Sequence, residues 1–196
     1  MKQIKIYFLF ALFMIAGSFQ LQAKIYNVKD FGAKADGKTI DSPSINQAIE
    51  NASNEGGGTV YIPSGEYACY SIRLKSHITI FLESGARIVA AFPTKDQGYD
   101  VAEPNEFNKY QDFGHSHWKN SLMWGIGLED ITICGSGLIY GKGLSREESR
   151  LPGAGNKAIS LKNCRNVIIK DISMLHCGHF ALLATGVDNL SVLNLK

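Results

Sequence analysis

The sequence has little net charge, and it has no apolar run long enough to span a bilayer comfortably. Its 196 residues carry a formal charge of +2, only 19% are charged, and no Lys/Arg-rich run is present. This balance excludes the strong electrostatic attraction on which nucleic-acid binding depends, so no nucleic-acid partner is expected. The apolar fraction of 45% is typical of a chain that folds around a core.

The longest apolar run has the organisation of a secretory signal. Two lysines precede the 11-residue run Ile6–Ala16, and a short stretch ending in Ala23 follows it. We therefore predict a signal peptide over residues 1–23, a folded domain over residues 24–196, and a periplasmic or secreted protein with no membrane contact after cleavage. The alternative interpretation is an uncleaved membrane anchor.

Cysteine is scarce, and its four residues are widely spaced. The spacing matches neither a CxxC metal site nor a dense disulfide framework, so we predict mostly buried free thiols. His176 and His179 flank Cys177, but metal sites need three or four converging groups. No metal and no cofactor is therefore predicted.

One amphipathic helix is predicted just after residue 41. Ser42 is suited to cap its N-terminus, Pro43 to occupy its first turn, and the three glycines that begin at Gly56 to end it. Its apolar face follows the i, i+3, i+4, i+7 spacing of a helix and consists of Ile45, Ala48, Ile49 and Ala52.

The rest of the chain consists of short β runs separated by turn residues. The candidate strands are Thr59–Ile62, Ser71–Lys75, Ile78–Leu82, Arg87–Ala91, Ile131–Cys134, Leu138–Tyr140, Ala158–Leu161, Val167–Ile169, Ala181–Ala184 and Leu190–Val192.

Four of these runs repeat one another and align in columns. One apolar column contains Ile78, Ile131, Val167 and Leu190, and the column before it contains His77, Asp130, Asn166 and Asn189. Apolar columns are typical of the inward positions of parallel strands, and Asn and Asp suit left-handed turns and can form ladders. In a third column, Leu128, Cys164 and Val187 coincide, so Cys164 is predicted to pack as a small apolar residue.

Two polar insertions, Thr94–Asn120 and Gly143–Lys157, account for the unequal repeat intervals. Repeats of about 23 residues indicate a solenoid whose insertions loop out on one face. The fold prediction is all-β: a right-handed parallel β-helix with an N-terminal capping α-helix. A sandwich or propeller is the alternative, but it would favour hairpin turns, and the one Asp-Gly precedes the helix. No second cap is visible, so truncation at the C-terminal end is expected.

Three segments carry a family resemblance. Residues 26–52 (YNVKDFGAKADGKTIDSPSINQAIENA), 56–67 (GGGTVYIPSGEY) and 72–88 (IRLKSHITIFLESGARI) resemble the start of polygalacturonase and rhamnogalacturonase-like enzymes, glycoside hydrolase family 28. The segments GSGLIYGKG and NCRNVIIKDI resemble later coils of that family. The opening segment also resembles related lyases, epimerases and tailspikes with this fold.

The resemblance implies a secreted enzyme that hydrolyses a pectic, galacturonic-acid-containing polysaccharide with inversion, and we expect it to be a monomer. Inversion needs two carboxyl groups about 6.5–9.5 Å apart. The family supplies them through Asn-x-Asp and Asp-Asp segments, followed by Gly-His-Gly and Arg-Ile-Lys, and this sequence has no Asp-Asp, Gly-His-Gly or Arg-Ile-Lys. No catalytic residue is therefore assigned; these residues are expected beyond Lys196, and this chain alone is expected to be inactive.

The candidate substrate-binding residues lie in the insertions and near the last turn. Aromatic and imidazole rings can contact sugars, and Arg can pair with a uronate carboxylate. The candidates are Tyr110, His115, Trp118, Arg150 and His179. For the rings of the first insertion, the alternative is that they only hold the loop to the coil. For Arg150, it is a solvated charged loop containing Glu147 and Glu148.

Two other classes of function stay open. A lyase or epimerase on the same scaffold would give Ca²⁺-dependent chemistry and, for a lyase, an unsaturated product. A non-catalytic carbohydrate-binding β-helix, such as an adhesin, would bind saccharide without forming product. Enzymes of the resembled family often have a Ser-Pro-x-Trp-like segment where this chain has Gly178–Leu183 (GHFALL). Because of this difference, the resemblance does not identify which pectic polysaccharide is the substrate.

Overall fold

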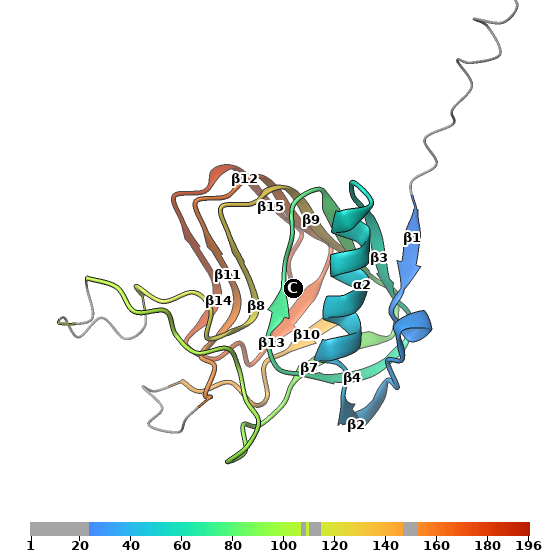
Figure 1. Cartoon of the computed structure of the whole chain (residues 1–196), viewed down its shortest axis with the longest axis horizontal. Coiled ribbons are helices and arrows are strands. Elements are labelled where there is room, and N and C mark those ends of the chain that lie inside the picture. Colours follow the sequence, from blue (N-terminus) through green and yellow to red (C-terminus); the bar gives the residue numbers. More distant parts are fainter. Residues whose placement is uncertain (1–23, 107–108, 110–114, 147–152) are drawn as a thin grey trace, which may run out of the picture.

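The computed structural model describes residues 24–106, 109, 115–146 and 153–196 of the chain. They form three parallel sheets that are coiled around one interior, as Figure 1 shows. The fold is a parallel β-helix, as predicted. The signal peptide predicted over residues 1–23, Tyr110 and Arg150 lie outside the described residues.

From β3 to β14, each coil contributes one strand to each sheet. The first sheet, called sheet A, has the order β1-β3-β6-β9-β12-β15, with the bounds Ile25–Asn27, Gly58–Ile62, Ile78–Leu82, Glu129–Gly135, Arg165–Lys170 and Asp188–Leu193. Sheet B has the order β13-β10-β7-β4-β2, with the bounds Ser173–Leu175, Leu138–Tyr140, Ala86–Ala90, Gly65–Cys69 and Asp36–Ile40. Sheet C has the order β14-β11-β8-β5, with the bounds Phe180–Thr185, Lys157–Lys162, Ser121–Ile126 and Ile72–Arg73.

The interior consists of apolar ladders that run from coil to coil. In sheet A, Ile80 pairs with Ile133, and Ile133 pairs with Ile169, and all three side chains are fully buried. Isoleucine and valine suit this position because their branched side chains pack well on a pleated surface. The predicted apolar column of Ile78, Ile131, Val167 and Leu190 lies in the same sheet; its first three side chains are buried, and Leu190 in the last strand is partly buried. Cys164 is buried as predicted, and the four cysteines, all described, are free thiols.

The column of turn residues forms a hydrogen-bonded ladder. His77, Asp130, Asn166 and Asn189 all have φ between 54° and 61°, the left-handed conformation expected of them. The Asn189 Nδ2 atom donates to Asn166 Oδ1 at 3.0 Å, and Asn166 Nδ2 donates to Asp130 Oδ1 at 2.8 Å. The His77 ring continues the ladder, with Nδ1 3.1 Å from Asp130 Oδ2. The predicted ladder is thus present and joins four coils.

The helix α2, Ser42–Asn54, follows β2, at the place where later coils have their sheet C strand. Its buried face packs against the first coil and covers the coil's interior at that end (Figure 1). A short 3-10 helix, η1 (Val28–Phe31), joins β1 to β2. The predicted cap is confirmed. In the described part of the chain, no helix combines the length and apolar character needed to cross a membrane.

The start of α2 differs from the prediction by one residue. Asp41, not Ser42, is the N-cap residue, and its side chain makes no capping hydrogen bond. Its carboxylate instead accepts the N–H groups of Lys34 and Ala35, at 2.7 and 2.9 Å. Ser42 lies in the first turn, where its hydroxyl oxygen accepts the N–H of Tyr70 at 3.1 Å. Both side chains therefore fix the start of the helix, one to the backbone before it and the other to the turn after β4.

Five strands were not predicted from the sequence. They are short, polar or glycine-containing, and they are β1, β2, β4, β8 and β13. Lys157, assigned above to the second insertion, is instead the first residue of β11 and is fully buried.

Candidate polysaccharide-binding site

Both insertions leave the coil at the same corner, between sheets B and C. Residues 91–120 connect β7 to β8, residues 141–156 connect β10 to β11, and the turn 176–179 connects β13 to β14. Because β7, β10 and β13 are neighbours in sheet B, these three connections start side by side. We call this region the insertion corner. Insertions on one face of a solenoid are often its binding surface.

The two insertions contact each other through their backbones. The N–H of Tyr99 donates to the carbonyl of Gly153 at 2.8 Å. Gly98 lies so close to Gly153 that a Cβ atom at position 98 would be 2.5 Å from the Gly153 carbonyl oxygen. The N–H of His179 donates to the carbonyl of Asn156 at 2.8 Å, which joins the third connection to the second. The corner is therefore one continuous surface.

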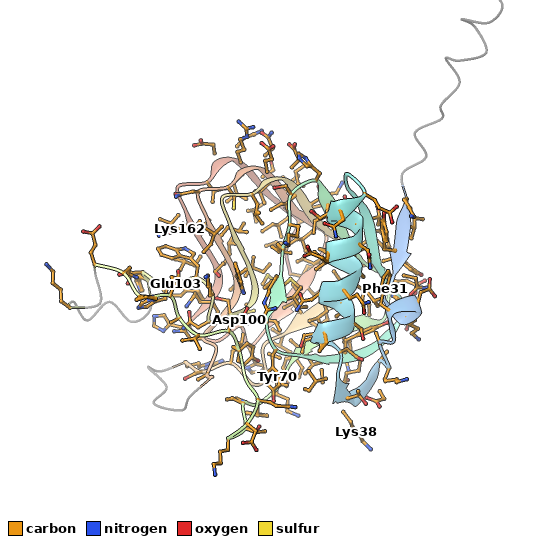
Figure 2. The ribbon with its side chains drawn as sticks, viewed as in Figure 1. Phe31, Lys38, Tyr70, Asp100, Glu103 and Lys162 are labelled. Atoms are coloured by element: carbon orange, nitrogen blue, oxygen red, sulfur yellow. The ribbon has the colours of Figure 1, made fainter. Side chains whose placement is uncertain are left out.

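Two carboxylates hold the first insertion in place: Asp100 binds it to the coil, and Glu103 joins two parts of the insertion to each other. The Asp100 carboxylate accepts hydrogen bonds from Arg73 Nε at 2.8 Å and from the indole N–H of Trp124 at 2.8 Å. Burial alone would raise the pKa of Asp100, but the hydrogen bonds from Arg73 and Trp124 outweigh it and lower this pKa. The Glu103 carboxylate accepts the N–H groups of Trp118 and Lys119, at 2.9 and 3.1 Å. Figure 2 labels Asp100 and Glu103 on this insertion.

Trp118 lies inside this connection. Its side chain is only 5% exposed, and Lys162 Nζ lies 4.1 Å from the ring centroid (Figure 2 labels Lys162). The ring therefore helps to hold the insertion to β11. A direct role of Trp118 in sugar binding stays a prediction.

His115 and His179 are brought together from two connections. Their ring centroids are 5.9 Å apart, and both rings pack edge-on against Phe180, at 4.7 and 4.5 Å. Both imidazoles are exposed, while Phe180 is half-buried. This cluster of three rings offers an aromatic edge and imidazole nitrogens to a ligand on the surface. The sequence separates the two histidines by more than 60 residues, yet the stacking of coils places them in contact.

A hollow of about 320 Å³ lies beside this cluster. Lys142 and Arg146 bring positive charge to it, and both side chains are exposed. The rings of Tyr140 and His176 form one side, with centroids 5.7 Å apart, and Arg146 Nη2 lies 3.3 Å from His176 Nδ1. A guanidinium and an ammonium at one hollow are suited to a carboxylate group, and the ring of Tyr140 to the face of a sugar.

A buried lysine supports the corner from within. Lys157 Nζ donates to the side-chain oxygen of Asn120 at 3.0 Å and to that of Asn156. Because the Asn156 carbonyl accepts the N–H of His179, this network connects β11 to the exposed ring cluster. Lys157, Tyr140 and Lys142 were not predicted from the sequence as residues of this surface. Tyr140 and Lys142 could have been selected from the sequence, because they lie at the end of a predicted strand and the start of the second insertion.

The histidines around Cys177 are not part of a cluster of potential metal ligands in the described part of the chain. Among the described residues, one group of His and acidic side chains has ligand atoms close enough for an ion, and it lies at another corner and excludes His176, Cys177 and His179. Burial raises the pKa of the Cys177 thiol, which further disfavours its thiolate.

Comparison with known proteins places this geometry in a family. Residues 25–166 match the family described as rhamnogalacturonase A/epimerase, pectate lyase-like. The chain belongs to this family. The match covers α2, the ladder residues as far as Asn166 and both insertions.

Curated relatives include both hydrolases and lyases. The chain is 27% identical over 172 residues to an exo-poly-alpha-D-galacturonosidase of Dickeya chrysanthemi, which covers 84% of this chain and 27% of the relative. It is 31% identical over 119 residues to a probable polygalacturonase of Vitis vinifera, covering 58% of this chain and 24% of the relative. It is 52% identical over 66 residues to alginate lyase 7 of Azotobacter vinelandii, covering 34% of this chain and 8% of the relative. The chain thus spans less than a third of each.

Solved structures share the fold. The exopolygalacturonase of Thermotoga maritima superposes with a TM-score of 0.68 at 21% identity, over 90% of this chain and 47% of that chain. The family 28 exopolygalacturonase of Yersinia enterocolitica gives a TM-score of 0.69 at 21% identity, over 89% of this chain and 38% of that chain. At this identity, the likeness supports the parallel β-helix and not an activity.

Proposed function

We propose that this chain is the N-terminal part of a periplasmic or secreted glycoside hydrolase of family 28 that acts on pectic polysaccharide. In this proposal the insertion corner binds the acidic sugar chain, and the catalytic carboxylates lie in coils beyond Lys196. The observation that carries the proposal is the hollow where Lys142 and Arg146 adjoin the rings of Tyr140 and His176. The overlap with the Dickeya exo-poly-alpha-D-galacturonosidase over 84% of this chain supports the same substrate class.

The chemistry of the corner fits a polyuronate. The two cations would pair with a carboxylate of the polymer, and the exposed imidazole rings of His115 and His179 would contact its sugar rings and hydroxyl groups. Tyr110 and Arg150 remain candidates for the same surface. In an inverting mechanism, one carboxylic acid beyond this chain would protonate the leaving oxygen, and a second carboxylate would activate water.

Binding of oligogalacturonate to the purified chain tests the proposal. The variant Arg146→Ala should weaken binding roughly 5- to 30-fold, because one charge-assisted contact contributes about 1–2 kcal/mol. The matched control is Lys38→Ala, which removes an exposed cation from β2, away from the corner. Equal losses in both variants would indicate a general charge effect and would contradict a specific site.

A second candidate function is polysaccharide lysis or epimerisation. It is favoured by the similarity to alginate lyase 7, 52% identical over 66 residues. Reading the coding sequence past the Lys196 codon distinguishes the two: Asn-x-Asp followed by Asp-Asp in the next coil supports hydrolysis. In an assay of the whole enzyme, an unsaturated product that absorbs ultraviolet light would support a lyase instead.

A further inference from the structure

Three potential metal ligands meet at the corner between sheets C and A. His77 lies in the turn before β6, and Glu129 and Asp130 begin β9. The N–H of His77 donates to the carbonyl of Glu129 at 2.9 Å, so the two coils are joined at this point by their backbones. A ring nitrogen and one oxygen from each carboxylate all lie within 4.8 Å of one another.

The spacing of these atoms suits a shared cation. His77 Nδ1 lies 3.1 Å from Asp130 Oδ2, and His77 Nε2 lies 3.6 Å from Glu129 Oε1. The second distance is too long for a hydrogen bond. These two contacts use different ring nitrogens, and one ion can take only one of them. With a single nitrogen and one oxygen from each carboxylate, the three atoms lie within 4.8 Å of one another. Ligand atoms that bind one ion at about 2.0–2.2 Å are separated by about 3–4 Å, so side-chain rotation would have to bring these three atoms closer together.

Neighbouring side chains orient both carboxylates through their other oxygens. Arg165 donates to Glu129 Oε2, with Nε at 2.6 Å, and Asn166 Nδ2 donates to Asp130 Oδ1 at 2.8 Å. The remaining oxygens, Glu129 Oε1 and Asp130 Oδ2, face the imidazole of His77. Such outer contacts are what fixes metal-binding carboxylates in known sites.

The site is open on one side and carries negative charge. A groove of about 540 Å³ adjoins it, and Glu129, Arg165 and Asp188 are among its lining residues. The carboxylates of Glu129, Asp130 and Asp188 outnumber the one guanidinium, that of Arg165, among these described side chains. The excess negative charge attracts a cation. The groove leaves space for water to complete a coordination shell.

We propose that His77, Glu129 and Asp130 form a zinc-binding site that bridges two adjacent coils. One imidazole nitrogen with two carboxylate oxygens suits Zn²⁺, whereas Ca²⁺ favours a shell made of oxygen atoms alone. His77 comes from one repeat and Glu129 and Asp130 come from the next, and for this reason no metal cluster is visible along the sequence. The bound ion would tie the turn before β6 to β9 and stabilise the folded chain.

Calorimetric titration of the full chain with ZnCl₂ and, separately, with CaCl₂ at neutral pH tests this site. One equivalent of Zn²⁺ should bind saturably, Ca²⁺ should give no comparable binding, and Zn²⁺ should raise the melting temperature. His77→Gln should weaken zinc binding at least tenfold and abolish the shift in melting temperature. His176→Gln, which removes an exposed histidine from the insertion corner, is the matched control and should change neither.

Two outcomes would overturn the proposal. One is wild-type protein that does not bind zinc, and the other is equal loss of binding in the His77 and His176 variants. Ring resonances of His77 in wild-type protein provide a measurement that does not depend on the folding of a variant. They should shift on addition of zinc, and unchanged resonances at saturating zinc would contradict the site.

Discussion

Truncation of isoleucines at adjacent positions tests the register of sheet A. Ile133 is fully buried and stacks between Ile80 and Ile169, which are also fully buried. Ile169 is equally buried, but its neighbour on the other side, Val192, is 43% exposed. Ile168 follows the opposite face of the same strand and is 39% exposed. The three positions therefore differ in enclosure while the residue type is the same.

The expected losses of stability follow that order. Ile133→Ala should lower the free energy of unfolding by about 3–5 kcal/mol, because the cavity is enclosed on both sides. Ile169→Ala should cost about 2–3 kcal/mol, because the exposed side near Val192 allows the cavity to relax. Ile168→Ala should cost less than about 1 kcal/mol, because this side chain is partly exposed to water and its removal leaves no enclosed cavity.

Urea unfolding of the purified chain, followed by circular dichroism, measures these differences through the midpoint at constant slope. A shift of strand pairing by one residue would exchange the inward and outward faces. Ile168→Ala would then be the more damaging of the two neighbouring variants. That result, or equal losses for Ile168 and Ile169, would refute the register described above.

Two further predictions concern the turns. Asn166→Ala should lower the free energy of unfolding by about 2–4 kcal/mol, because it removes two ladder hydrogen bonds and places alanine at φ 54°. Urea unfolding measures this loss, and a value below about 0.5 kcal/mol would contradict a stabilising role of the ladder. Asp36 accepts the N–H groups of Thr39 and Lys38, which lower its pKa to about 2. Because the folded-state pKa is below the unfolded value, this stabilisation is present above about pH 4 and is lost as the pH falls towards 2. Melting temperatures of Asp36→Asn should therefore fall less steeply between pH 4 and 2 than those of wild type, and parallel curves would contradict this.

The coiled architecture could be predicted because equivalent positions of successive repeats contact one another in a solenoid. Residues such as Asn166 and Asn189 occupy equivalent positions in successive coils, so their alignment directly gives their pairing. The start of α2 could not be predicted to the residue, because Asp41 and Ser42 are both good caps. Their actual partners, such as the N–H of Tyr70, are set by tertiary contacts.

The insertion corner was predicted only in part. The sequence indicated that the insertions share one face, and the rings of His115 and His179 were selected from residue type alone. The hollow at Tyr140 and Arg146 depends on contacts between coils, and the close approach of Gly98 to Gly153 depends on two loops that are remote in sequence. Neither the periodicity of the strands nor the composition of the loops carries that information.

The same scaffold supports different chemistries. A shared β-helix therefore does not determine the reaction, and the side chains at the insertion corner carry the functional argument.

Mapping of oligogalacturonate binding by NMR on isotope-labelled chain tests the central claim most directly. We predict that resonances of His115, His176, His179 and Phe180 shift on titration, while those of Tyr61 and Phe81 on the outer face of sheet A stay unchanged. Saturable shifts confined to the insertion corner would support the assignment of that corner as the polysaccharide-binding surface. Shifts centred on sheet A, or no shifts at millimolar oligosaccharide, would contradict it.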